Sequence, residues 1–243
     1  MTVPETSAQI LLWLREGEAR FLTEINGLTA NDIREDSALP DWSRAHVMAH
    51  VARNAEAVSR LLAWARTGTQ TQMYPDMDSR NRDIDASAGQ EPDALRADVR
   101  RTSAQFDADI AALPDAAWSA RVRTFHGRDI PATAVIWMRV REIWLHLVDL
   151  DTGVSVDSWP AELVDALLDD VTATMNARPD APSIRLRATD RERAWQIGTE
   201  SSQDVSAHQV SGSAADLLAW LTGRSSGHGL ATDGELPSPP HWM

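Results

Sequence analysis

The stretch REIWLHLVD, residues 141–149, places a glutamate and a histidine four residues apart inside an apolar segment. The surrounding apolar spacing predicts a helix, and residues four apart on a helix share one face, with Cβ atoms roughly 5–6 Å apart. Glu142 and His146 are therefore expected to converge on one point. A shared proton and a shared metal ion are the two usual reasons for such a pair, and the spacing leaves both open.

A metal site in a helical protein needs ligands from more than one helix. The segment RAHVMAHVARNAEAVSRLLAWAR, residues 44–66, offers a second pair at the same spacing, His46 and His50. His50 lies among apolar residues, whereas His46 is closer to the helix start. We therefore expect His50, Glu142 and His146 to form the ligand set, because three such ligands leave one position open, as in catalytic zinc sites. Mixed nitrogen and oxygen ligands suit Zn²⁺ or another borderline divalent ion.

The first part of the chain is expected to be a helical bundle. Apolar residues recur at helical spacing in four segments, residues 7–28, 44–66, 92–114 and 131–153. Ser43 is the predicted N-cap of the second helix and Gly68 its end, and residues 68–91 are expected to be a long polar connection. Four helices of this length across residues 1–153 predict a bundle whose ligand sites lie between facing helices.

The remainder of the chain has a different pattern. Three strands are expected between two helices, the strands at residues 183–190, 193–198 and 204–212 and the helices at 159–177 and 213–224. This order predicts a small α+β domain over residues 158–243, with the Pro-rich tail on its surface. The predicted fold class is mainly α with a second α+β domain.

Composition excludes several functions. The net charge of −13 argues against a nucleic-acid or anionic membrane surface. The chain has no cysteine, and all 23 basic residues are arginine, which excludes disulfides, a protein thiol nucleophile and Schiff-base lysine chemistry. Apolar runs are shorter than the roughly 18 residues of a membrane helix, and the start MTVPETSAQ does not resemble a signal peptide. We therefore expect a cytoplasmic protein.

Four stretches together carry a family resemblance. They are ALPDWSRAHVMAHVARNAEAVSRLL, MYPDMDSRNRDID, RVREIWLHLVDLDTG and DLLAWLTGR. They resemble the mycothiol-dependent maleylpyruvate isomerase family of the DinB-like metalloprotein superfamily, over nearly the whole chain. The resemblance implies a DinB-like four-helix bundle and a divalent metal, usually zinc, held by His50, Glu142 and His146. It also implies that the second domain contributes to the active-site cleft, and that His46 is not a ligand.

The resemblance also singles out two arginines. Arg224 matches the arginine of the family's WLTGR stretch, which reaches the metal site and is the candidate catalytic residue; the alternative is a surface arginine at a helix end. Arg80 matches a recurrent loop arginine that is expected to bind the cofactor or a carboxylate, with Arg82 nearby; either could instead balance local aspartates. Asp149 is expected either to orient a ligand or to be exposed.

The activity implied by the resemblance is the isomerisation of maleylpyruvate to fumarylpyruvate in gentisate degradation, with mycothiol as cofactor. A thiolate adds to the cis double bond, which becomes a single bond, and its elimination leaves the trans isomer. A free thiol is only a few per cent ionised at neutral pH, whereas a metal-bound thiol is deprotonated. A mycothiol S-transferase that conjugates electrophiles and a non-catalytic metal- or ligand-binding module are the alternatives. The oligomeric state stays open.

Overall fold

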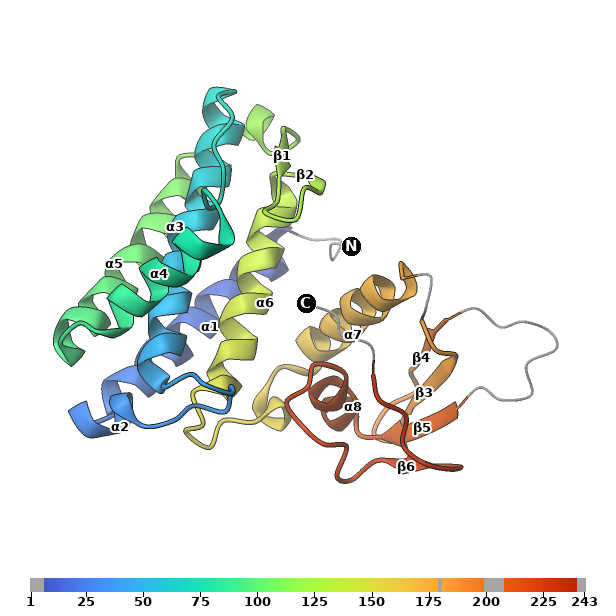
Figure 1. Ribbon diagram of the computed structural model, residues 1–243. Helices are drawn as coiled ribbons and strands as arrows, with labels where there is room; N and C mark the ends of the chain where they lie inside the picture. The colour runs from blue at the N-terminus through green and yellow to red at the C-terminus, as the bar shows by residue number, and fades with distance from the viewer. Residues whose placement is uncertain (1–6, 179–180, 199–207, 240–243) are drawn as a thin grey trace. The chain divides into compact units, whose positions relative to one another are not determined.

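The computed structural model describes residues 7–178, 181–198 and 208–239. These residues form eight α-helices and six strands, and the chain divides into two compact units at Gly153. The first unit is helical apart from one two-stranded hairpin, and the second combines two α-helices with a four-stranded sheet (Figure 1). The predicted fold class, mainly α with a second α+β domain, is confirmed. Among the described helices, none has the length and apolar character needed to cross a membrane.

Four long helices build the first unit. They are α1 (Ser7–Gly27), α3 (Arg44–Thr67), α5 (Pro92–Ala111) and α6 (Thr133–Asp149). Helix α1 packs on α6, α6 on α3, α3 on α5, and α5 on α1, which closes the bundle (Figure 1). Helices α3 and α6 are therefore direct neighbours, and they carry the three predicted ligands.

Local signals set the bounds of α3 where the sequence predicts them. Ser43 has an extended backbone as N-cap, and its N–H donates to Nδ1 of His46 at 3.2 Å. At the other end Gly68 adopts a left-handed conformation with φ 71°, and its N–H donates to the carbonyl of Trp64 at 2.8 Å. Both cap residues are thus confirmed.

Tight packing brings α1 against α6. Trp144 is fully buried, and its Nε1–H donates to the backbone oxygen of Trp13 at 2.8 Å. A Cβ atom at Gly17 would lie 2.6 Å from that Nε1, so only glycine allows this approach. Trp144 lies two residues after Glu142, so this contact fixes α1 against the part of α6 that carries the predicted ligands.

The connection predicted at residues 68–91 is wrong in part, because residues Met77–Ala88 form helix α4. Its N-cap Asp76 accepts a hydrogen bond from the Ser79 N–H at 2.6 Å. The helix packs on α3 but buries only Ile84, Ser87 and Ala88. So small a buried face leaves little apolar periodicity in the sequence, which is why the pattern does not predict it.

Three further elements of the first unit differ from expectation. They are the short helix α2 (Ala30–Arg34) and the hairpin of β1 (Arg121–Arg123) with β2 (Asp129–Pro131). Pro131 pairs with Arg121 in this hairpin, so α6 begins at Thr133 rather than at the proline. The hairpin packs beside α3 and α6.

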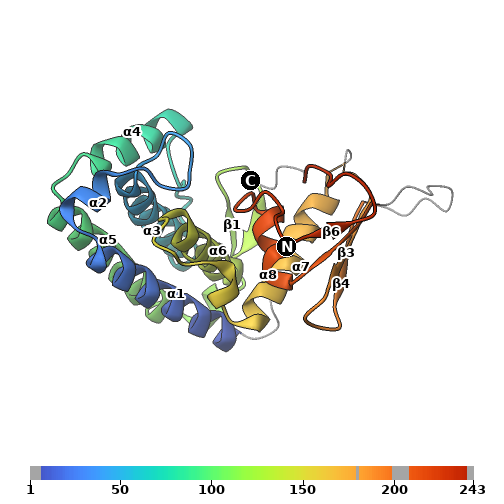
Figure 2. The same cartoon turned by 90° about the horizontal axis from the view of Figure 1, so that it is seen from below.

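The second unit contains the two predicted helices and a mixed sheet. Its elements are α7 (Ala161–Asn176), β3 (Ile184–Ala188), β4 (Ala194–Ile197), β5 (His208–Gly212), α8 (Ala214–Leu221) and β6 (Ala231–Thr232). The strand order is β4-β3-β5-β6, and only β3 and β5 are parallel. Figure 2 shows α7 and α8 on one face of this sheet. Strand β6 was not predicted, and residues 204–207 of the third predicted strand lie outside the described residues.

Candidate metal centre

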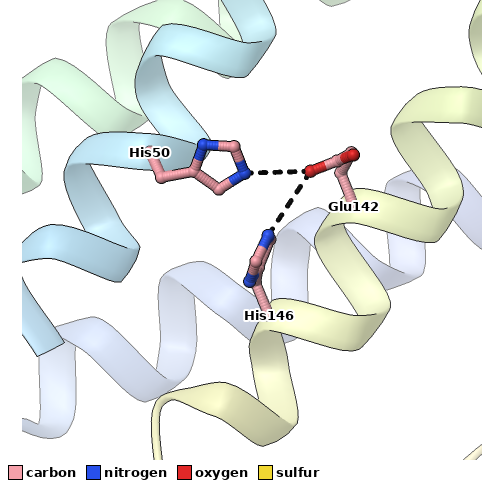
Figure 3. A group of neighbouring side chains, drawn as sticks. All are labelled: His50, Glu142 and His146. Atoms are coloured by element: carbon pink, nitrogen blue, oxygen red, sulfur yellow. Dashed lines mark hydrogen bonds and ion pairs between the residues drawn. The ribbon is translucent and has the colours of Figure 1, made fainter. Parts of the chain in front are cut away.

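Three predicted ligands from α3 and α6 converge on one point (Figure 3). Nε2 of His50 lies 3.0 Å from Oε2 of Glu142, and Nε2 of His146 lies 3.4 Å from the same oxygen. One potential ligand atom from each residue lies within 4.8 Å of the other two. The helical spacing of Glu142 and His146 and the packing of α3 on α6 together produce this cluster.

The cluster is largely removed from water. His50 and His146 are 5% and 7% exposed, and the Glu142 side chain is 17% exposed. The indole of Trp42 covers one side, with its ring centroid 5.6 Å from that of His50. A carboxylate in such a place requires a proton or a cation for compensation.

Asp149 orients the ring of His146. Its Oδ2 lies 2.8 Å from Nδ1 of His146, and the carboxylate is 1% exposed. The carboxylate can only accept when ionised, so Nδ1 carries the hydrogen and Nε2 faces Glu142. Of the two predictions for Asp149, orientation of a ligand fits the structure and surface exposure does not.

The pKa values of the three groups diverge. Burial, together with the nearby His146, lowers the pKa of His50 to about 4. Burial also opposes ionisation of Glu142, but hydrogen bonds from His146 and His50 hold its pKa well below the usual range. Although burial lowers the pKa of His146, hydrogen bonds to Asp149 and Glu142 raise it above its ordinary value. The two histidines thus favour the ionised form of the Glu142 carboxylate.

The same donors fit a divalent ion. Zinc binds histidine nitrogen and carboxylate oxygen at about 2.1 Å, which places two ligands of a tetrahedral ion roughly 3.4 Å apart. The separations of 3.0 and 3.4 Å agree with that spacing. An ion held by these three residues would have room for a small molecule as a further ligand. Nitrogen and oxygen donors of this kind suit several borderline metals.

Arg80 lies on α4 rather than in a loop, and it contacts the cluster. Its Nη2 is 3.1 Å from Nδ1 of His50. A guanidinium only donates, so Nδ1 accepts, and Nε2–H of His50 donates to Glu142. An ion at Nε2 needs that lone pair, so the ring hydrogen would move to Nδ1 and face Arg80. Ion binding at His50 and the Arg80 contact therefore oppose each other.

The structure separates the other candidates from the cluster. His46 caps α3 through Ser43, and its Nε2 lies 3.9 Å from Asp85. Arg82 donates to Oγ of Ser79 at 2.9 Å. These two side chains are therefore engaged elsewhere in the first unit.

Arg224 belongs to the second unit, just after α8. Its Nη1–H donates to the backbone oxygen of Thr222 at 2.6 Å. A role for this guanidinium in the chemistry at the cluster remains a prediction.

Tyr74 is a candidate that the sequence patterns did not identify. It is the chain's single tyrosine, it is 7% exposed, and its ring centroid lies 5.7 Å from the Arg80 guanidinium carbon. Burial raises the pKa of its phenol to about 12, so the hydroxyl stays protonated. Tyr74 lies in the stretch MYPDMDSRNRDID, one of the four that carry the family resemblance. Its contact with Arg80, however, depends on the fold.

In comparisons with known proteins, the two units match the two domains of one protein family. Residues 14–151 match the mycothiol maleylpyruvate isomerase N-terminal domain, and residues 158–241 match the C-terminal domain of the same family. No curated protein sequence matched.

Solved structures agree with the domain matches. A crystal structure of the mycothiol-dependent maleylpyruvate isomerase aligns over 100% of both chains with 30% identity and a TM-score of 0.92. A histidine-to-alanine mutant of a mycothiol-dependent maleylpyruvate isomerase aligns equally completely, with 29% identity and a TM-score of 0.91. YfiT from Bacillus subtilis, described as a probable metal-dependent hydrolase with a four-helix bundle, has 14% identity and a TM-score of 0.51. It covers 62% of this chain and 89% of its own, and shows similarity of fold alone.

Proposed function

Because this chain belongs to the mycothiol-dependent maleylpyruvate isomerase family, we propose that it converts maleylpyruvate to fumarylpyruvate with mycothiol. The observation that carries the proposal is the buried convergence of His50, Glu142 and His146. Substrate and product contain the same atoms and electrons, so the reaction needs neither an oxidant nor a net proton. One carbon–sulfur bond forms as the double bond opens, and it breaks after rotation to return the thiolate.

The cluster is proposed to hold a divalent ion, with Zn²⁺ as the first candidate. When bound, the ion would keep an incoming thiol deprotonated at neutral pH, which matters because the chain has no cysteine of its own. Asp149 keeps the His146 ring in the tautomer that a ligand needs. Glu142 is proposed to be a ligand that contributes negative charge. It is not assigned as a base, because the reaction requires no dedicated base.

Two arginines are proposed to bind the anionic substrate and to stabilise the charge that develops on it. Addition of sulfur beside the ketone develops enolate charge, and preorganised donors stabilise such charge strongly in a partly dry site. Arg224 is the proposed donor to this charge. Arg80, already against His50, is proposed to bind a substrate carboxylate or the cofactor. With net charge −13 in the whole chain, local guanidinium groups are needed to attract an anion.

The direct test is an assay of metal content and turnover on protein purified without a histidine tag. Maleylpyruvate and mycothiol are added, and formation of fumarylpyruvate is followed. Isomerisation that requires both mycothiol and a bound metal supports the proposal. Conjugation of a test electrophile without isomerisation would instead support an S-transferase, and metal binding without thiol-dependent turnover would support a non-catalytic module.

A pair of histidine variants tests the ligand set. His50→Ala removes one of three ligands, so metal affinity is expected to fall by more than about 100-fold, beyond what loss of a supporting group causes. His46→Ala is the matched control on the same helix and should retain the metal. Full metal occupancy in the His50 variant would rule out this ligand assignment.

A further inference from the structure

A second feature of the first unit is a pocket of about 260 Å³. It lies between the end of α3, the segment 70–75 and the β1–β2 hairpin, and it is lined by aromatic rings and amides, chiefly Trp64, Tyr74, Phe125, Gln70 and Gln72. None of the site residues predicted from the sequence is among the described residues that line it. Its composition indicates which kind of ligand it can bind.

The aromatic wall is held in place by the fold. The rings of Tyr74 and Phe125 meet edge to face, with centroids 5.7 Å apart at 77°. The Phe125 N–H donates to Sδ of Met73 at 3.3 Å, and Nη2 of Arg60 donates to the Met73 backbone oxygen at 2.7 Å. The first contact connects the hairpin to the segment 70–75, and the second connects that segment to α3. The pocket therefore presents rigid aromatic surface, suited to the C–H face of a saturated ring.

Most of the polar lining is uncharged. Arg123 is the one charged residue among the described lining residues, and its Nε–H donates to Oδ1 of Asp129 at 2.9 Å. The side-chain amides of Gln70 and Gln72 are exposed and make no hydrogen bond to another described residue. Each amide can both donate and accept. This pattern favours a neutral ligand with several hydroxyl groups over a phosphate or a carboxylate.

Tyr74 connects this pocket with the metal centre. Its ring lines the pocket and also lies 5.7 Å from the guanidinium carbon of Arg80. Arg80 in turn contacts His50, with Nη2 3.1 Å from Nδ1. The side chains of Tyr74 and Arg80 thus lie between the pocket and His50, which sets the span that a single molecule reaching both places has to cover.

We propose that this pocket binds a polyhydroxylated ring of the thiol cofactor. Mycothiol carries its thiol on N-acetylcysteine, which is joined to glucosamine and then to inositol, both rich in hydroxyl groups. The volume of about 260 Å³ is below the range of roughly 300–1,000 Å³ for whole ligands, so the pocket takes one ring while the thiol arm passes Tyr74 toward the cluster. The identity of the cofactor rests on the proposed function; the preference for a neutral polyol rests on the lining.

The first test uses glucosaminyl-inositol, the part of the cofactor without sulfur, as the calorimetric probe. The double variant Gln70→Ala/Gln72→Ala removes two hydrogen-bonding amides from an exposed segment, and binding is expected to weaken about tenfold. Gln105→Ala, on α5 and outside the pocket, is the control and should bind as the parent protein does. Equal affinity in the double variant, or absence of binding to the parent protein, overturns the proposal.

The second test separates this inference from the proposed activity. The preference for mycothiol over N-acetylcysteine, measured as the ratio of kcat/KM values in maleylpyruvate isomerisation, should fall about tenfold in the double variant. Active enzyme with an unchanged ratio contradicts the pocket assignment while the proposed function survives. Amide-dependent binding of glucosaminyl-inositol by a protein that does not isomerise maleylpyruvate supports the pocket and refutes the proposed function.

Discussion

Asp149 and His146 form a buried pair on α6, with Oδ2 of the carboxylate 2.8 Å from Nδ1 of the imidazole. They are three residues apart, so one turn of helix sets their separation. The His146 ring is therefore oriented by the chain before any ion arrives. This pair also supplies negative charge behind a ligand, which raises the basicity of the imidazole.

Asp149→Asn is expected to weaken metal binding about 10- to 100-fold. The amide keeps the size of the side chain but removes its charge, and it can turn either its oxygen or its NH₂ group toward Nδ1. Competition with a chelator measures the affinity. Asp109→Asn on α5 is the charge-matched control, and equal affinities for the two variants would show that Asp149 does not support the ligand.

Arg80→Met is expected to increase metal affinity by at least about fivefold. The substitution removes a positive charge near the ion and the donor that opposes the required tautomer of His50. The same chelator competition measures the change, with Arg82→Met on α4 as the control. A decrease in affinity would mean that Arg80 supports the ion, contrary to the tautomer argument.

Glu18 gives the bundle a distinct dependence on pH. The residue is 6% exposed, and burial raises its pKa above 4.5 despite the nearby Arg139. Between the unfolded and the raised folded pKa, the folded chain binds more protons than the unfolded chain. The contribution of Glu18 to the free energy of unfolding therefore falls as the pH rises through that window.

Glu18→Gln should remove this contribution. The stability of the variant relative to the parent protein is then expected to increase as the pH is raised from about 4.5 through the window. Urea unfolding at a series of pH values measures the difference, with Glu24→Gln on the same helix as the control for loss of a glutamate. A relative stability that declines over this range would contradict the direction of the pKa shift.

Sequence reasoning succeeded where the signals are local or repeat along one face. Ser43 and Gly68 mark the ends of α3 through their own backbone preferences, and the spacing of Glu142 and His146 places them together on any helix. Convergence with His50 required in addition that α3 and α6 be neighbours. In a bundle of four long helices only a few arrangements are possible, and several of them make these two helices adjacent. Local patterns were sufficient for the two caps and for the Glu142 and His146 pair, whereas the convergence with His50 followed from the expected bundle.

The missed features depend on tertiary packing. Helix α4 buries few side chains, so its apolar pattern is weak. Tyr74 approaches Arg80 only because the segment 70–75 and α4 fold back beside α3. The hairpin that completes the pocket pairs two strands of three residues each, too short for alternation to be evident. Their roles follow from contacts between distant segments.

Gly17→Ala tests whether the packing of α1 on α6 determines the position of the cluster. Alanine normally favours a helix interior by about 1 kcal/mol over glycine, but here its Cβ would lie 2.6 Å from Nε1 of Trp144 and 2.8 Å from Cγ2 of Ile143. Overpacking of this kind typically costs about 1–3 kcal/mol, so thermal and urea unfolding should show a net loss of stability. Gly27→Ala, which meets no atom within 4 Å, is the control. Because Ile143 directly follows Glu142, metal affinity should fall together with stability, and unchanged affinity in a destabilised variant would show that the cluster does not depend on this contact.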